Sequence, residues 1–377
     1  MAPGLVERTA EEEKPQVNEN RATYKEVFAY GGPKSYKKEH ELQGTATQPP
    51  ASFPNYLPTW PDTTYAALEP FEHYEHGKDA DPSFPDLLPQ GTEVDDLTGN
   101  IGAEVKGIQL SQLTDKGKDQ LALFVAQKKV VAFRDQDFAS LPIPDALQIG
   151  EYFGRHHIHM ASGAPDGHPE VHLVHRGADD ATALNFFKDR TNSSTWHTDV
   201  SFEAQPPGTT FLYVLDGPKA GGDTLFANMV EAYNRLSPEF QKRLHGLKAT
   251  HSSIEQAAAS RDRGGVVRRE PITTEHPVVR THPATGEKAL YVNSQFTRRI
   301  VGFKKEESDF LLKFLYDHVA LSQDLQCRVR WRPGTVVVWD NRVCAHSAIL
   351  DWKDGQRRHI ARITPQAERP YETSFED

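Results

Sequence analysis

The sequence predicts a mainly β fold with flanking helices, compatible with a double-stranded β-helix, the jelly-roll or cupin-like core. Runs of β-branched and aromatic residues are typical of short strands, and they lie at 130–133, 210–215, 289–292, 328–331, 335–339 and 359–364. Apolar residues that recur every three or four positions predict helices, at 114–129, 237–247 and 307–320. The residues with metal-binding chemistry fall on or beside the strands, which suits a barrel that carries a site inside it.

Local signals define the individual helices. The first begins near Thr114, a residue type that caps helix N-termini. The second begins at Ser237, and Pro238 in its first turn has a backbone angle that suits a helix. The charged stretch 255–275 lacks such a pattern, so we expect a mobile loop there, a candidate lid over a pocket.

Two regions divide the chain. Residues 1–94 are rich in Pro, Glu, Lys and His and have sparse apolar periodicity, so they predict an N-terminal extension that is partly disordered or forms an arm that wraps a neighbour. Residues 95–377 contain the predicted strands and helices and are expected to form the catalytic domain.

Composition excludes several classes of protein. The net charge of −10 argues against a nucleic-acid partner, which would favour a basic face. The two cysteines, Cys327 and Cys344, provide no disulfide framework and favour a reducing compartment. No apolar run approaches the about 20 residues that span a bilayer, and the N-terminus does not resemble a signal peptide. We expect a cytoplasmic enzyme without membrane contact.

Two imidazoles and one carboxylate form the most informative pattern. His197 and Asp199 are two residues apart, so on an extended segment both side chains point to one side. With His346 they make the ligand set of a non-haem iron(II) site, which leaves metal positions open for a cosubstrate and dioxygen. An isolated histidine such as His346 is more often a core residue bound to a carbonyl group, so this alternative stays open on the residues alone.

Arginines follow His346 on the last predicted strand. Arg358, Ile360 and Arg362 alternate with its other residues and so project to one side. A guanidinium group pairs with two oxygens of a carboxylate or sulfonate, which makes this side a candidate anion-binding wall. Thr224, between an apolar strand and an expected helix, could bind the same anion. The alternative for both arginines is a surface ion pair with this acidic chain.

Together these motifs resemble the taurine dioxygenase family of iron(II)- and 2-oxoglutarate-dependent oxygenases. The resemblance covers about 95–364, and the N-terminal extension looks like that of the fungal sulfonate dioxygenases in the family. It implies a jelly-roll core, Fe(II), the cosubstrates 2-oxoglutarate and O2, and a homodimer or homotetramer. The stretches that match in order and spacing are 101–107, 196–199, 221–224, 276–283, 291–296, 339–346 and 356–362.

The resemblance also implies a role for each matched residue. His197, Asp199 and His346 would bind iron, Thr224 and Arg358 would hold the distal carboxylate of 2-oxoglutarate, and Arg362 would clamp a substrate sulfonate, with His159, Val200 and Phe296 as further substrate contacts. The implied reaction converts 2-oxoglutarate to succinate and carbon dioxide and hydroxylates the carbon next to the sulfonate. That product collapses to an aldehyde and sulfite, a step of sulfur metabolism.

Two departures from the family pattern concern the substrate. Ser193 and Ser162 replace an asparagine and a tyrosine of the taurine enzymes, so taurine itself is not implied. An oxygenase for another anion, such as an aryloxyalkanoate, a sulfate ester or a biosynthetic intermediate, would use Arg362 in the same way. Two other classes are also compatible with the residues: a zinc hydrolase, because two histidines and one aspartate can hold zinc, and a non-catalytic jelly-roll assembly protein that binds through its arm.

Overall fold

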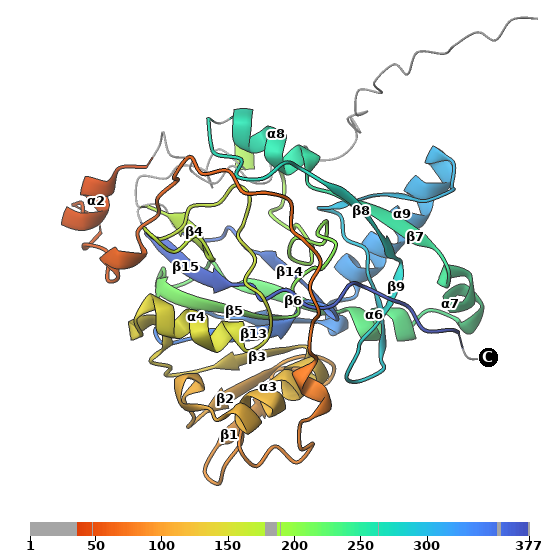
Figure 1. Ribbon diagram of the computed structural model, residues 1–377, viewed down its shortest axis with the longest axis horizontal. Coiled ribbons are helices and arrows are strands. Elements are labelled where there is room, and N and C mark those ends of the chain that lie inside the picture. The colour runs from red at the N-terminus through yellow and green to blue at the C-terminus, as the bar shows by residue number, and fades with distance from the viewer. Residues whose placement is uncertain are drawn as a thin grey trace, which may run out of the picture.

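Two facing β-sheets form the centre of the molecule, and helices cover their outer sides (Figure 1). The computed structural model describes residues 36–46, 48–177, 187–188, 190–262, 264–352 and 356–375. The expectation of disorder at the N-terminus falls on residues outside these ranges.

The large sheet contains β15, the strand that carries Arg358 and Arg362. Its strands are antiparallel except for the parallel pair β2 and β3, and β15 lies between β5 and β4. In spatial order the strands are β1 (Glu93–Asp96), β2 (Ala103–Lys106), β3 (Val130–Phe133), β13 (Val336–Asp340), β5 (Thr209–Asp216), β15 (Arg358–Ile363) and β4 (Val171–Arg176).

The small sheet consists of β12 (Gln326–Val329), β6 (Thr224–Asn228) and β14 (Cys344–Ala348). An isolated antiparallel bridge between His197 and His346 adds the segment around His197 to the free side of β14. Further strands lie beside this barrel: β11 (Thr297–Ile300), β7 (Lys248–Ser252) and β8 (Thr273–Pro277) in one sheet, and β10 (Lys288–Leu290) and β9 (Val279–Thr281) in another.

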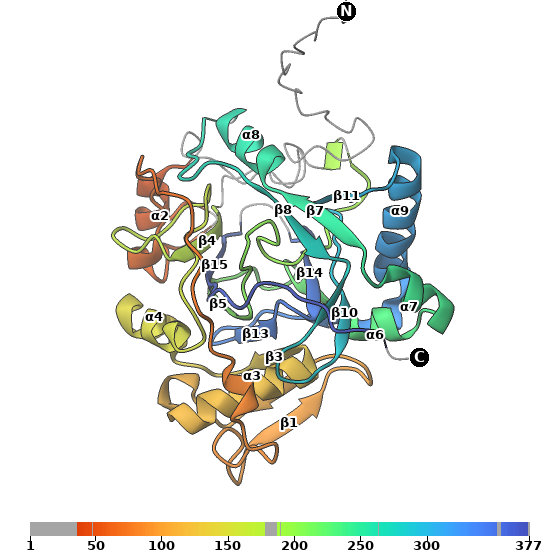
Figure 2. The ribbon, with the colours of Figure 1, turned by 45° about the vertical axis from the view of Figure 1, so that its right-hand side comes forward.

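Successive side chains along each strand point to opposite faces of its sheet, and the apolar ones form three layers. The layer between the two sheets contains Val130, Leu212, Phe226, Trp339 and Ile360. The outer face of the large sheet packs against α3 (Asp115–Lys128) and α4 (Ile143–Glu151), and the small sheet packs against α6 (Met229–Asn234) and α9 (Lys305–Leu321), near α7 (Pro238–Leu244). Figure 2 shows these two groups of helices on opposite sides of the sheets. Burial on both faces explains why the central strands are almost continuously apolar.

Most predicted elements are present, with shifted ends. Thr114 caps α3 by accepting a hydrogen bond from the Gly117 amide, and α7 ends at Leu244, three residues early. The mobile loop expected over 255–275 is wrong at both ends, because α8 (Ile254–Asp262) occupies its first part and strand β8 begins at Thr273. Thr224 begins strand β6 and does not precede a helix directly, as was expected.

The described part of the N-terminal extension lies across the protein's own catalytic region. This arm, residues 36–92, includes α2 (Lys38–Gln43) and passes over the barrel toward α3, as the red-to-orange segment in Figure 1 shows. Its backbone pairs at Thr59 with Ala164, and the Tyr65 amide donates to the Arg268 carbonyl over 2.6 Å. None of the helices in the described ranges is long and apolar enough to cross a membrane.

Candidate metal centre

The structure brings His197, Asp199 and His346 together. Asp199 Oδ1 lies 3.7 Å from His197 Nε2 and 3.6 Å from His346 Nε2. The two histidines face each other because their backbones exchange two hydrogen bonds, of 3.0 and 2.8 Å, across the bridge that joins 197 to β14. Asp199 follows two residues later and turns its carboxylate to the same side.

The donor set fits a divalent metal ion. Ligand atoms at about 2.0–2.2 Å from one ion lie about 3–4 Å from each other, as these atoms do. His197 Nδ1 must donate to the Thr195 carbonyl, 2.9 Å away, which places the ring's lone pair on Nε2. Burial lowers the pKa of both His197 and His346, so both rings are neutral and able to bind a cation. Two imidazoles, one carboxylate and remaining open positions are the chemistry that iron(II) oxygenases use.

Asn341 holds the candidate ligand Asp199 in place, a role that was not predicted from the sequence. Its Oδ1 accepts from the Asp199 amide over 2.7 Å, and its Nδ2 donates to the Asp199 carbonyl over 3.1 Å. The amide side chain therefore binds both backbone groups of a residue far away in the sequence. Its position in the matched stretch 339–346 was the available signal.

A buried ionic cluster surrounds the turn that carries Asn341. Arg342 donates to Asp340 on the same turn and to Glu75 of the arm. His282 Nε2 lies 3.0 Å from Asp340. Burial by itself raises the pKa of Asp340, but Arg342 and His282 lower it well below its usual range. Each charge in the cluster is paired with an opposite charge, which holds the turn in place. The pair of Arg342 with Glu75 also connects the arm to the site.

Glu75 also belongs to a second group with the composition of a metal site, together with His73 and Glu368. Both carboxylates are already paired with guanidinium groups, Glu75 with Arg342, and Glu368 with Arg342 and Arg280. These positive charges oppose a cation, so this group is part of the ionic cluster.

Arg358 and Thr224 are buried, which excludes the surface ion pair considered for Arg358. Arg358 Nε donates to the Gly222 carbonyl over 3.0 Å, and its guanidinium lies over the Trp352 ring. Thr224 Oγ1 accepts from Trp331 Nε1 over 3.3 Å. The 221–224 turn and β15 thus bring the two predicted 2-oxoglutarate residues to the same end of the barrel.

Arg362 lies against the candidate metal ligands. Its Nη1 donates to Asp199 Oδ1 over 2.6 Å, and its Nη2 donates to His172 Nδ1 over 3.2 Å. His172 is opposite Arg362 on the neighbouring strand β4 and was not singled out from the sequence. The side chain predicted to clamp a substrate anion is therefore also bound to the carboxylate ligand.

The predicted substrate contacts have different surroundings. Val200 and Phe296 are buried in one apolar cluster with Met160 and Phe202, and Val200 has a backbone φ of +38°, a strained value for a β-branched residue directly after a ligand. The Nδ1 of His159 accepts hydrogen bonds from the Ala161 and Ser162 amides. Its Nε2 contacts the Gln256 side-chain amide, 3.2 Å away.

Comparisons with known proteins agree with this geometry. The family model described as taurine catabolism dioxygenase TauD, TfdA family matches residues 93–364. The chain is 48% identical to an alpha-ketoglutarate-dependent sulfonate dioxygenase of Saccharomyces cerevisiae, over 85% of this chain and 79% of that protein. It is 33% identical to an alpha-ketoglutarate-dependent sulfate ester dioxygenase of Pseudomonas putida, over 74% of this chain and 90% of that protein.

A solved structure is also similar. It is a putative alpha-ketoglutarate-dependent taurine dioxygenase from Burkholderia xenovorans, with a TM-score of 0.61 and 31% identity, and the match covers 74% of this chain and 94% of that one. The match to the yeast protein covers 85% of this chain, whereas residues 93–377 make up only about three quarters of it. The match therefore extends into the arm.

Proposed function

The chain belongs to the TauD, TfdA family of dioxygenases, and from this membership we propose that it is an Fe(II)- and 2-oxoglutarate-dependent dioxygenase of alkanesulfonates. The observation that carries the proposal is the convergence of His197, Asp199 and His346 on one point between the sheets. Its substrate class is supported by the yeast relative, which is named a sulfonate dioxygenase.

We assign the metal to His197, Asp199 and His346. Bound there, iron, 2-oxoglutarate and O2 supply the oxidation that hydroxylates the substrate carbon next to the sulfonate. Asn341 keeps the Asp199 backbone fixed, and Arg362 balances the charge of its carboxylate. Fixed ligands matter because a misplaced reacting group loses much of the rate that correct alignment provides.

We assign 2-oxoglutarate to Arg358 and Thr224, and the substrate anion to Arg362. Arg358 is positioned by Gly222 and Trp352, so its fork is held at the end of the barrel next to Thr224. Val200 and Phe296 would form an apolar wall against the carbon chain of the substrate, and His159 directly precedes Met160 of the same cluster. An apolar wall excludes water from the carbon to be oxidised, and the arginines provide the polar contacts that set orientation.

The experiment is a panel of alkanesulfonates with succinate and sulfite measured in the same reaction. Sulfite and succinate formed in equal amounts, with dependence on Fe(II), 2-oxoglutarate and O2, support the proposal. Succinate formed without sulfite on every sulfonate would remove the desulfonation step while leaving the oxygenase class intact.

A sulfate ester is the second candidate substrate, favoured by the Pseudomonas putida relative. The same hydroxylation next to the ester oxygen would release sulfate in place of sulfite, so an alkyl sulfate in the panel separates the two. The zinc hydrolase and the non-catalytic assembly protein are not retained, because the family consists of oxygenases. We also propose a cytoplasmic location, in line with two buried free thiols, and a homo-oligomer.

A further inference from the structure

We propose that His172 is a substrate-binding residue that determines specificity for an oxyanion, by donating a hydrogen bond from Nε2 to the anion held at Arg362. The proposal deepens the function proposed above and rests on it for the position of the substrate. Neither the resemblance nor the matched motifs assigned a role to His172.

The bond to Arg362 fixes the tautomer of His172. A guanidinium group can only donate, so His172 Nδ1, 3.2 Å from Arg362 Nη2, must accept. The proton of the neutral ring is therefore on Nε2. Desolvation and the Arg362 charge hold the pKa of His172 well below its usual range, which keeps the ring neutral. The result is an N–H donor whose orientation is set by the arginine beside it.

Strand geometry directs this donor to the inner side of the barrel. The neighbours of His172 on β4, Val171 and Leu173, pack in the outer layer with Ala361 and Ile363 of β15. By alternation, His172 shares the inner side with Arg362, its partner across the two strands. The side chain is partly exposed, and Nε2 has no hydrogen-bond partner within the described ranges.

His159 differs from His172 in what its nitrogens contact. The rings of the two histidines meet edge to face with centroids 4.4 Å apart, but both nitrogens of His159 already face protein groups. Its Nδ1 accepts from two backbone amides, so its Nε2 carries the proton and lies 3.2 Å from the Gln256 side-chain amide, whose oxygen is the group that can accept it. In this arrangement His159 positions the loop 159–162, and His172 is the imidazole that has a donor left for a ligand.

An anion bound at Arg362 would need a second hydrogen-bond donor. Two of its nitrogens are already engaged, Nη1 with the Asp199 carboxylate and Nη2 with His172. A sulfonate has three oxygens and is bound best by donors from more than one direction. A hydrogen bond to a charged group contributes about 1.5–3 kcal/mol, which corresponds to about 10- to 100-fold in affinity.

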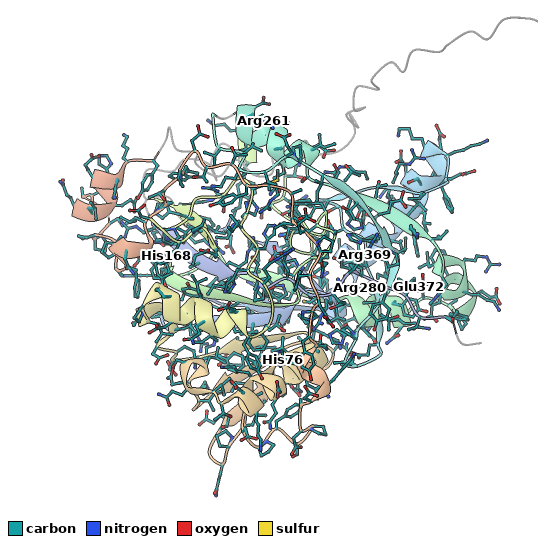
Figure 3. All side chains as sticks on the ribbon, viewed as in Figure 1. His76, His168, Arg261, Arg280, Arg369 and Glu372 are labelled. Atoms are coloured by element: carbon teal, nitrogen blue, oxygen red, sulfur yellow. The ribbon has the colours of Figure 1, made fainter. Side chains whose placement is uncertain are left out.

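The test compares His172→Leu and His172→Gln with His168→Leu, a matched control four residues earlier in the chain, labelled in the left part of Figure 3. In His172→Leu we expect KM for the sulfonate to rise about 10- to 100-fold, with small changes in kcat, in KM for 2-oxoglutarate and in Fe(II) binding. The Gln variant keeps an N–H donor and should recover part of the loss, and His168→Leu should behave as the natural protein.

Binding is measured separately by anaerobic calorimetric titration of ethanesulfonate and of inorganic sulfate into the protein loaded with Fe(II) and 2-oxoglutarate. Weaker binding of either anion by His172→Leu supports the inference, even if the natural protein releases no sulfite and the proposed function fails. Unchanged anion binding would overturn it. Loss of Fe(II) binding together with substrate binding would also overturn it, because His172 would then act only through Arg362 and Asp199.

Discussion

The proposed metal ligands and the arm are held to the rest of the molecule by different means. His197, Asp199 and His346 sit on backbone pairs inside the barrel, and Asn341 binds Asp199 through both backbone groups. The arm instead crosses the outside and is attached by separate anchors, among them the buried carboxylates of Glu41 and Glu75. The backbone pairs inside the barrel fix the relative positions of the three side chains. The anchors of the arm instead decide which segments lie over the site.

We expect this difference to separate chemistry from selectivity. The family model begins at residue 93 and therefore includes the barrel without the arm. The arm reaches the site region through Tyr65, which binds the backbone of Arg268, and Arg268 in turn donates to the carbonyl groups of His159 and Ser162. We expect changes in the barrel to affect iron and cosubstrate, and changes in the arm to affect stability and the substrate side.

The largest expected effect comes from removing a ligand. His346→Ala leaves one imidazole and one carboxylate, so we expect loss of stoichiometric Fe(II) binding and of succinate formation. Anaerobic Fe(II) titration measures the first, and the assay with 2-oxoglutarate measures the second. Cys344→Ala, on the same strand β14, is the control and should keep Fe(II) binding. Full Fe(II) affinity in His346→Ala would break the assignment of the ligands.

Asn341→Ala tests the support of the ligand. The Asp199 amide would lose its buried acceptor while all three ligands remain, and changes of this kind outside the ligand set typically cost about 10- to 100-fold in metal affinity. Titration with Fe(II), together with thermal unfolding of the metal-free protein, distinguishes a loosened site from an unfolded chain. Equal Fe(II) affinity in the variant and the natural protein would show that the backbone bridge alone is sufficient.

Glu41→Gln tests the anchor of the arm. Glu41 is paired with Arg357 and His175, and breaking a buried ion pair by removing one partner costs about 3–5 kcal/mol when the structure cannot adjust. The cost is smaller here because Asp216 Oδ2 also lies 3.6 Å from the Arg357 guanidinium. Because the arm can lift away, we expect a smaller loss, visible as faster proteolysis within residues 36–60. Glu39→Gln, on the exposed side of the same helix, is the control. Fe(II) binding should stay unchanged in both variants.

Acid should release the same anchor. Burial by itself raises the pKa of Glu41, but His175 and Arg357 together lower it below its usual value. A carboxyl group with a lowered pKa in the folded state contributes stability above its ordinary pKa and loses it as the pH falls through the folded-state pKa. Proteolysis of the arm by an acid-active protease should therefore increase at low pH in the natural protein and depend less on pH in Glu41→Gln.

Gly222→Ala gives the smallest effect and concerns the cosubstrate. A Cβ at Gly222 would lie 3.0 Å from Cδ and Nε of Arg358, and Gly222 has a φ of +69°. Gly246 has a φ of +78° with open space around it, so Gly246→Ala has the backbone strain without the contact. We expect a several-fold higher KM for 2-oxoglutarate in Gly222→Ala only. The same KM in both variants would remove Gly222 as the support of Arg358.

Much of the fold could be predicted from the sequence, because strands buried on two sides are nearly continuous apolar runs and Thr114 is a strong helix cap. The jelly-roll prediction is confirmed by the similarity to the Burkholderia protein. The prediction of a loop over 255–275 was wrong at both ends, because α8 and β8 are short and contain many polar residues, so their formation depends on tertiary contacts.

The site was only partly predictable. The spacing of His197 and Asp199 was readable because it is local, and the family resemblance pointed to His346. Asn341 and His172 were missed as site residues because their partners, Asp199 and Arg362, are distant in sequence, and neither amide nor imidazole side chains indicate a partner by type. The sequence also did not predict the ion pairs of the arm, because Glu75 and Arg342 meet only after folding.

The bridge between His197 and His346 has a consequence for protein synthesis. About 150 residues separate the two histidines, so the second is synthesised well after the first. Until β14 has left the ribosome, a nascent chain has one imidazole and one carboxylate to offer, too few to capture iron selectively. Metal loading would then begin only after β14 has been synthesised, and by mass action the captured ion would favour the folded barrel over every intermediate that lacks this strand.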